Sequence, residues 1–350
     1  MKQSIMIAAA AVLAAAVLCA PVSALSARCA CVMDAQTGAI LYAKNETQPG
    51  LIASTTKIMT GLLICEDCDL DEEIAVPPEA AGIEGSSMYL KAGERVRVED
   101  LLYGMMLRSG NDCAAALAIA HSGSVDAFVH AMNDRARELG LRQTRFANPH
   151  GLDDRENHST AADLARLACA AMDNEIFARV AGTKSYRFGA QTIVNHNRLL
   201  LRYPGADGVK TGFTKAAGRI LVSSAVRDGR RLVCVTLHDP DDWNDHCRLL
   251  DAGFSRFSSV LLAAEGQVMG LLPSRAPLVC ARDVRALVLP GERVECVRVT
   301  IAHDGGQAEF LCAGRVLATC PLTERPTGEN NGGTDPKDHS DPGRRLPQAG

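Results

Sequence analysis

Three short polar motifs, which follow one another within a single domain-sized stretch, constrain this chain more than any other feature. They are Ser-Thr-Thr-Lys at residues 54–57, Ser-Gly-Asn at 109–111 and Lys-Thr-Gly at 210–212. Each is weak alone, because a Ser-x-x-Lys or a Ser-x-Asn arises by chance about once in a chain of this length. The sequence has only eight lysines, however, and Lys57 alone has a serine three residues before it. Together the motifs indicate a serine acyl-transfer enzyme with lysine as its base.

The first motif has the residue types that a nucleophile and its base require. A serine hydroxyl attacks poorly until a base removes its proton, and lysine can do this only when burial or a neighbouring cation lowers its pKa. Residues three apart on a helix share one face, so Ser54 at a helix start would place its oxygen beside the Lys57 amine. The apolar run at 58–64 predicts a buried helix that would desolvate Lys57. The alternative is that Ser54 is merely an N-cap.

The second motif lies between two helical patterns, at residues 100–107 and 114–118, which predicts a tight helix–helix connection. In an active site, Ser109 would relay a proton toward the leaving amine, and the Asn111 amide would hold the substrate backbone. Taken alone, the tripeptide indicates only a turn.

The third motif follows a turn at residues 203–209 and is expected to enter a short strand. Lys210 would supply positive potential and Thr211 a hydroxyl for an anionic substrate group. Gly212 would let the substrate backbone approach closely. The competing interpretation is a solvated lysine at a strand edge.

With these motifs in this order and spacing, the chain resembles the D-alanyl-D-alanine carboxypeptidases, which are low-molecular-mass penicillin-binding proteins. Further blocks that resemble the family lie at residues 33–38, 53–60, 148–152, 158–161 and 207–214. The resemblance implies a hydrolase that removes the terminal D-alanine from peptidoglycan stem peptides through an acyl-enzyme, and that β-lactam antibiotics acylate.

The resemblance also implies a role for each motif residue. It assigns catalysis to Ser54 as nucleophile, Lys57 as base and Ser109, and substrate binding to Asn111, Lys210, Thr211, Gly212 and Phe213. The backbone N–H groups of Ser54 and Phe213 would form the oxyanion hole. No metal and no other cofactor is expected.

The expected fold class is α/β in the α+β sense: an antiparallel sheet flanked by helices, as in β-lactamases and transpeptidases, with a mainly helical subdomain. The sequence predicts a hairpin of 29–33 with 39–42, a helical block at 54–180, strands at 193–194, 219–222 and 231–235, and a helix at 242–260. Short apolar runs separated by Pro and Gly then indicate a small C-terminal β domain.

These patterns divide the chain into a signal peptide at 1–24, a carboxypeptidase domain at 25–262, a β domain at 263–322 and a disordered polar tail at 323–350. Lys2 precedes an apolar run, and Val-Ser-Ala at 22–24 is a plausible cleavage site. We therefore expect export to the cell-wall side of the cytoplasmic membrane. The tail lacks the amphipathic helix that frequently ends family members, which makes membrane attachment doubtful.

Charge and cysteine content narrow the possible partners. The net charge is −4 and no dense basic run occurs, so nucleic-acid binding has no support. Twelve of the thirteen cysteines follow the signal segment without a compact framework. For Cys65 and Cys68 the possibilities are a metal site, a local disulfide or, as for most of the others, plain thiols.

Four alternatives stay open from the sequence. His150 is either a loop-stabilising residue or a functional one, and Arg198 is a candidate for binding a carboxylate. A class A-like β-lactamase shares the motifs but needs a glutamate that activates water, and only Glu156 is nearby. A penicillin-binding sensor with slow turnover would retain the same pocket.

Overall fold

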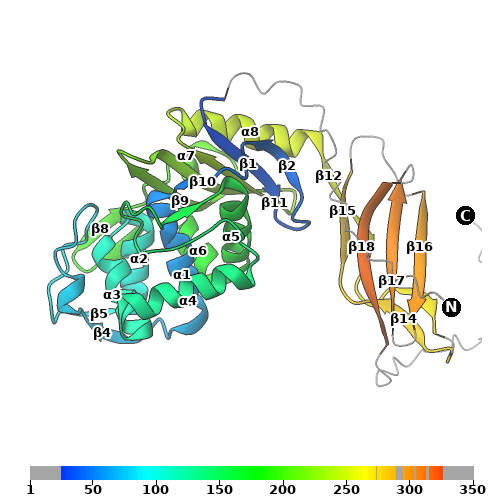
Figure 1. Ribbon diagram of the computed structural model, residues 1–350, viewed down its shortest axis with the longest axis horizontal. Helices are drawn as coiled ribbons and strands as arrows, with labels where there is room; N and C mark the ends of the chain where they lie inside the picture. Colours follow the sequence, from blue (N-terminus) through cyan, green and yellow to red (C-terminus); the bar gives the residue numbers. More distant parts are fainter. Residues whose placement is uncertain (1–24, 273, 289–294, 303–304, 313–314, 326–350) are drawn as a thin grey trace, which may run out of the picture. The chain divides into compact units, whose positions relative to one another are not determined.

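The computed structural model describes residues 25–272, 274–288, 295–302, 305–312 and 315–325 (Figure 1). The predicted signal peptide and the tail beyond residue 325 lie outside the described residues. The chain folds into two compact units, with the first boundary between Val260 and Leu261, and residues 285–288 belong to the first unit.

The first unit is built on a five-stranded antiparallel sheet in the order β2-β1-β11-β10-β9. Its strands are β1 (Cys29–Asp34), β2 (Ile40–Lys44), β9 (Ala206–Thr214), β10 (Gly218–Arg227) and β11 (Arg230–Leu237). The predicted N-terminal hairpin is confirmed, since β1 pairs with β2 in antiparallel register. The other edge of β1 pairs with β11, which lies about two hundred residues later in the chain and joins the two ends of the unit.

Both faces of this sheet are covered, and the strand sequences show why. Cys31 and Val235 belong to one apolar core, whereas Val32 and Cys234 belong to the other. Successive side chains of a strand point to opposite faces, so a strand buried on both sides must be apolar at every position. Helix α8 (Asp242–Arg256) covers one face and α5 (Ala161–Asp173) the other (Figure 1).

The helical block predicted at 54–180 is confirmed. It contains η1 (Ala53–Thr56), α1 (Lys57–Asp67), η2 (Pro78–Ala80), α2 (Val98–Arg108), α3 (Asn111–Ser122), α4 (Val125–Glu138), α5 and α6 (Glu175–Gly182). Short strand pairs join β3 (Gly50–Leu51) to β6 (His158–Ser159), β4 (Glu73–Ala75) to β5 (Arg95–Arg97) and β7 (Ser185–Phe188) to β8 (Gln191–Val194), and α7 (Leu199–Arg202) precedes β9. The Thr160 hydroxyl caps α5 by accepting from Asp163 N at 3.1 Å.

The helix predicted at 242–260 is wrong at its C-terminal end. Helix α8 stops at Arg256, and Phe257 is already extended. Residues Ser258–Ala263 form β12, which pairs with β15 (Val284–Val288), so strand pairing overrides the helical pattern there.

The second unit confirms the small C-terminal β domain. Its five-stranded sheet has the order β13-β14-β18-β17-β16, from β13 (Val268–Leu271), β14 (Pro277–Cys280), β16 (Cys296–Ala302), β17 (Gly305–Cys312) and β18 (Arg315–Glu324). Leu278, Phe310 and Leu322 lie in its core. Strand β18 pairs with β14 through Glu324, two residues past the predicted end of this domain at 322.

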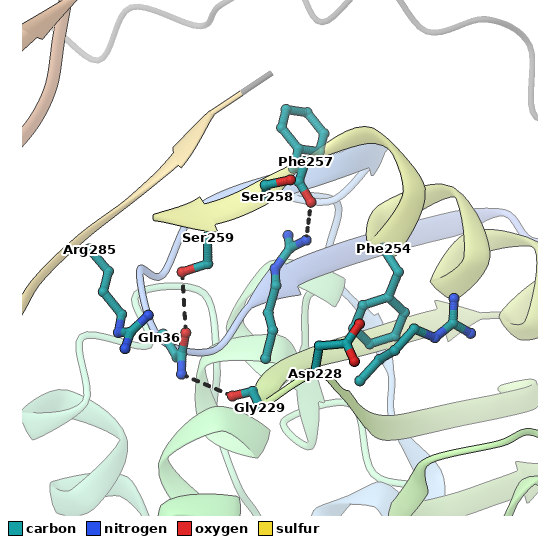
Figure 2. Close-up of a pocket in the computed structure, with 10 residues that line it drawn as sticks. Gln36, Asp228, Gly229, Phe254, Phe257, Ser258, Ser259 and Arg285 are labelled. Atoms are coloured by element: carbon teal, nitrogen blue, oxygen red, sulfur yellow. Dashed lines mark hydrogen bonds between the residues drawn. The ribbon is translucent and has the colours of Figure 1, made fainter. Parts of the chain in front are cut away.

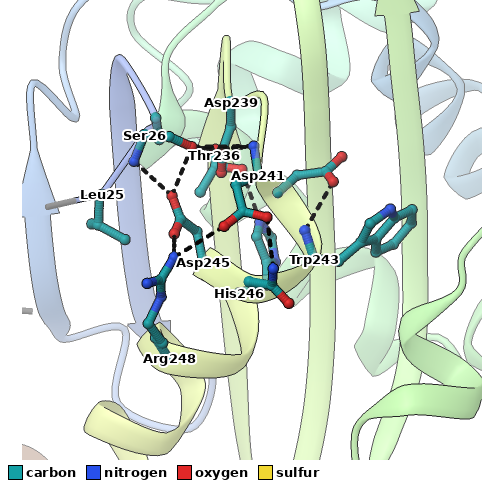
Figure 3. Close-up of polar contacts among 12 residues, drawn as sticks. Leu25, Ser26, Thr236, Asp239, Asp241, Trp243, Asp245, His246 and Arg248 are labelled. Atoms are coloured by element: carbon teal, nitrogen blue, oxygen red, sulfur yellow. Dashed lines mark hydrogen bonds and ion pairs between the residues drawn. The ribbon is translucent and has the colours of Figure 1, made fainter. Parts of the chain in front are cut away.

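The first described residues are held firmly on the first unit (Figure 3). Ser26 donates its backbone N–H to Asp245 Oδ2 at 2.8 Å and its hydroxyl to Asp239. Lys44 Nζ donates to the Leu25 carbonyl at 3.1 Å. These hydrogen bonds hold the segment just before β1 in place and so fix the position at which the strand begins.

The cysteines are mostly buried. In the part of the chain that the structure describes, all twelve from Cys29 to Cys320 are free thiols, and Cys65 is not linked to Cys68. Burial raises the pKa of Cys65 to about 12, which keeps it protonated. No group of acidic, histidine or cysteine side chains in the described residues could hold a metal ion. Nor does any described helix combine the length and apolar character needed to cross a membrane.

Candidate active site

Ser54 and Lys57 lie together, as the first motif predicts. Ser54 sits in the 3₁₀ turn η1, directly before α1, and Lys57 Nζ lies 3.2 Å from Ser54 Oγ. Ser54 is not the cap of either helix, since the cap positions belong to Ile52 and Thr56 and neither makes a side-chain capping bond. The N-cap alternative is therefore wrong, and the serine hydroxyl is directed at the lysine.

The environment of Lys57 favours a neutral amine. The side chain is completely buried, and its Nζ also donates to Asn111 Oδ1 at 2.7 Å and to the His150 carbonyl at 2.5 Å. Burial lowers the pKa of Lys57 well below its usual value, and the nearby charge of Lys210 lowers it further. An uncharged amine beside a serine hydroxyl can accept its proton.

The second motif forms the expected connection between α2 and α3. Ser109 ends α2 in the left-handed conformation, with φ of 65°, and Asn111 begins α3. The buried Ser109 Oγ has no hydrogen-bond partner among the described residues. A hydroxyl that is buried and unpaired costs about 1–3 kcal/mol, so this group is available for a partner that enters the cavity.

Asn111 connects the second motif to the first. Its Oδ1 accepts from Lys57, and its Nδ2 donates to the Glu84 carbonyl at 2.7 Å. An amide nitrogen has two hydrogens, so one remains for a substrate carbonyl. Asn111 therefore both orients the Lys57 amine and retains a donor.

The third motif lies inside a strand, not at its entry. Strand β9 begins at Ala206, so Lys210, Thr211 and Gly212 occupy its second half. Lys210 is 1% exposed and donates to the Thr211 carbonyl at 3.0 Å, so the interpretation as a solvated edge lysine is wrong. Although β9 is the edge of the sheet, α6, α7 and η1 pack against it. Burial lowers the pKa of Lys210 to about 7.

Gly212 brings β9 against the turn η1, which carries Ser54. A Cβ atom at this position would lie 3.2 Å from the Ile52 carbonyl oxygen and 3.3 Å from Ser54 N. Any side chain would push the strand away from the turn. The glycine thus brings the backbone of β9 close to the Ser54 amide, and the next residue, Phe213, is 65% exposed.

Sequence reasoning missed the contribution of the loop at residues 148–152. The His150 carbonyl, rather than its imidazole, contacts Lys57. Burial and the charge of Lys57 lower the pKa of the His150 ring to about 4, so it is neutral near pH 7. Gly151 has φ of 88°, and a Cβ there would lie 1.9 Å from the Ala53 carbonyl oxygen. The resemblance to the family at 148–152 indicated the loop, but it did not indicate that a backbone carbonyl of the loop contacts Lys57.

These elements enclose a cavity of about 550 Å³. The side chains and backbone that line it come from all three motifs and from the segments around them: Ser54, Ser86, Arg108, Ser109, Val194, Asn195, His196, Arg198, Thr211, Gly212, Phe213, Arg219, Ile220, Asp242 and Trp243. Arg198 is thus placed in the same cavity as the motif residues. Glu156 does not line it and instead pairs with Arg145 at 2.9 Å on the surface.

A second hollow, of about 320 Å³, shares no lining residue with the first (Figure 2). It lies in the first unit beside Gln36, Phe254, Phe257 and Ser259. Two of its arginines already have acidic partners, Arg230 with Asp34 and Arg227 with Asp251. It contains no serine–lysine pair and is not the candidate active site.

Comparison with known proteins agrees with this geometry. The family model for D-alanyl-D-alanine carboxypeptidases of the S11 peptidases matches residues 15–241. The chain is 36% identical over 315 residues to D-alanyl-D-alanine carboxypeptidase DacF of Bacillus subtilis, covering 85% of this chain and 81% of that protein. It is also 36% identical over 236 residues to DacB2 of Mycobacterium tuberculosis, covering 64% and 81%.

A solved structure is similar over nearly the same span. Penicillin-binding protein 5 from Haemophilus influenzae superposes with a TM-score of 0.79 at 28% identity, covering 86% of this chain and 97% of that one. With a matching family model, a relative of more than 30% identity across most of the chain and the same architecture, the chain belongs to the D-alanyl-D-alanine carboxypeptidase family of serine-type peptidases.

Proposed function

We propose that this enzyme is exported and removes the terminal D-alanine from peptidoglycan stem peptides through an acyl-enzyme on Ser54. The observation that carries the proposal is the buried Lys57 amine, which lies 3.2 Å from Oγ of Ser54, a residue that lines the same cavity as Ser109 and Thr211. A neutral lysine at this distance can act as the general base.

In the acylation step, Lys57 takes the proton of Ser54 as Oγ attacks the carbonyl carbon of the penultimate D-alanine. The backbone N–H groups of Ser54 and Phe213 stabilise the oxyanion, as Gly212 keeps β9 close to the turn. The amide bond breaks, and terminal D-alanine leaves after its nitrogen receives the proton through Ser109. Water then attacks the ester as Lys57 accepts its proton, the bond between the acyl carbon and Ser54 Oγ breaks, and Lys57 returns the proton to that oxygen, which regenerates Ser54.

The terminal carboxylate of the substrate binds at the third motif. Lys210 and Thr211 provide a cation and a hydroxyl, and Arg198 adds a guanidinium from the same cavity. With a pKa of about 7, Lys210 carries at most part of its charge in the free enzyme at neutral pH, and a bound carboxylate would restore it.

The decisive experiment measures release of D-alanine from a synthetic stem peptide. We expect catalytic turnover by the wild type and none by Ser54→Ala. A β-lactam should acylate the wild type, and peptide mapping by mass spectrometry should place the adduct on Ser54. Acylation without turnover of any stem peptide would instead identify a sensor, and rapid hydrolysis of the β-lactam would identify a β-lactamase.

Export rests on the sequence at 1–24, outside the described residues. Expression of the full chain in a bacterial host, followed by N-terminal sequencing of the extracytoplasmic fraction, should show a chain that begins near Leu25. Full-length protein confined to the cytoplasm would refute this part of the proposal.

A further inference from the structure

Asp112, which directly follows the second motif, is a buried carboxylate that the mechanism above does not use. It is the second residue of α3, and it is fully buried. It does not line the active-site cavity, so it does not contact a substrate there. A buried carboxylate destabilises a fold unless donors or cations surround it. The partners of Asp112 therefore show what this carboxylate holds in place.

Most of its donors come from the loop between η2 and β5. Asp112 Oδ2 accepts from Ser87 Oγ at 2.6 Å. The same oxygen accepts from two backbone N–H groups, Met88 N at 2.9 Å and Leu90 N at 3.1 Å. Tyr89, between them, has a φ of 62°, a left-handed conformation with which neighbouring N–H groups can face one anion. The carboxylate thus fixes this half of the loop on the start of α3.

The other half of the same loop contacts Asn111. The Asn111 backbone N–H donates to the Ser86 carbonyl at 2.7 Å, and Asn111 Nδ2 donates to the Glu84 carbonyl at 2.7 Å. A Cβ atom on Gly85, between these two residues, would lie 2.9 Å from Asn111 Nδ2. Asn111 and Asp112 therefore hold one loop at two neighbouring points, and Ser86 of that loop lines the cavity.

The contact with Glu84 decides which end of the Asn111 amide faces Lys57. A carbonyl only accepts, so it binds the amide nitrogen and leaves Oδ1 for the lysine. A neutral lysine amine has two hydrogens and one lone pair. The hydrogens go to Asn111 Oδ1 at 2.7 Å and the His150 carbonyl at 2.5 Å, which leaves the lone pair for Ser54. A rotated Asn111 amide would present an N–H group that competes for this lone pair.

We propose that Asp112 is a positioning residue for the acylation of Ser54. Its carboxylate holds residues 84–90 on the start of α3, and that loop keeps the Asn111 amide turned so that the Lys57 lone pair faces the serine. This inference rests on the proposed function and adds a residue that acts without contact with the substrate. The alternative, that Asp112 only stabilises the first turn of α3, does not account for the three donors from the loop.

The first test is Asp112→Asn, which keeps the size of the side chain and can no longer accept every donor of the loop. Acylation of Ser54 by a chromogenic β-lactam should slow about tenfold to a hundredfold. Burial is the main cause of the lowered pKa of Lys57, and the charge of Asp112 acts in the opposite direction. Rates are therefore compared by stopped-flow kinetics on the pH plateau, where Lys57 is neutral in every variant.

Ser87→Ala is the second variant, because it keeps the charge of Asp112 and removes one donor. It should slow acylation about threefold to tenfold without a shift of the pH profile, and it carries the test if Asp112→Asn does not fold. Asp34→Asn is the matched control. Asp34 is equally buried, accepts from Thr37 N at 2.9 Å and Thr37 Oγ1 at 2.8 Å, and does not line the cavity. This control should lower the melting temperature and leave the acylation rate unchanged.

A double-mutant cycle tests whether Asp112 acts through Asn111. In an Asn111→Ala background, Asp112→Asn should slow acylation by less than about twofold further, because the amide that it positions is gone. Two results would overturn the inference: full multiplication of the two effects, or an Asp112→Asn variant that reaches the wild-type plateau rate and differs only in the pH at which the plateau begins. The second result would limit Asp112 to its charge. Failure of the proposed function is different, because then the wild type would form no adduct on Ser54.

Discussion

Two regions of the first unit bury basic side chains, and they differ in whether the buried side chain is paired with a carboxylate. In the candidate active site, Lys57 and Lys210 are buried without a carboxylate partner among the described residues, and burial lowers the pKa of both. Arg230, beside the second hollow, is 7% exposed and pairs with the fully buried Asp34 at 2.6 Å. A buried cation that is paired with a carboxylate keeps its charge and stabilises the fold. A buried lysine without a carboxylate has a lowered pKa, and its neutral amine can act as a base.

The largest expected effect concerns the base. Lys57→Ala should slow acylation of Ser54 by a β-lactam about 10²- to 10⁴-fold, since that is the usual contribution of a general base. Stopped-flow kinetics with a chromogenic β-lactam measures it. Lys215→Ala, at an exposed lysine outside the cavity, is the matched control and should leave the rate unchanged. A wild-type rate for Lys57→Ala would remove this lysine from the mechanism.

Loss of the structural cation should affect stability instead. Arg230→Met leaves Asp34 buried without its partner, which should cost about 3–5 kcal/mol of unfolding free energy. Arg95→Met breaks an exposed pair with Glu73 and should cost less than about 1 kcal/mol. Denaturant titration of the two variants tests the difference. Equal losses of unfolding free energy in the two variants would show that burial of the Arg230–Asp34 pair adds nothing to its contribution.

The carboxylate site that we propose at the third motif should give a smaller effect. Replacing the C-terminal carboxylate of a D-Ala-D-Ala peptide with an amide should lower kcat/KM about tenfold to a hundredfold, since charge-assisted contacts are worth about 1.5–3 kcal/mol. In Lys210→Met the two peptides should differ much less. If the wild type cleaves both at the same rate, the third motif does not recognise the carboxylate.

The most gradual effect is a pH dependence of stability. A folded-state pKa of about 7 for Lys210 means that, between pH 7 and the ordinary lysine value, the unfolded chain binds a proton that the folded chain does not. Unfolding free energy should therefore rise with pH, by at most about 1.4 kcal/mol per pH unit. Comparison of the wild type with Lys210→Met isolates this slope. Identical slopes from pH 7 to 9 would mean that Lys210 is charged when folded.

Much of the fold could be predicted because its pattern is local. The apolar strands β1 and β11, the helical block and the connection between α2 and α3 each follow from neighbouring residues. The end of α8 could not be predicted from the helical pattern, because the residues after Arg256 pair as β12 with the distant β15. A competing partner far along the chain is invisible to a local pattern.

The sequence by itself determined the chemistry: a serine with a lysine three residues later, a second serine, and a Lys-Thr-Gly strand. The tertiary structure alone decided what those groups can do. Lys57 donates to Asn111, which is 54 residues away in the sequence, and to the His150 carbonyl, which is 93 residues away. Lys210 is on β9 and is buried because other elements of the fold pack against that strand. The pKa of a lysine depends on the atoms that surround it, and in the folded protein those atoms come from distant parts of the chain.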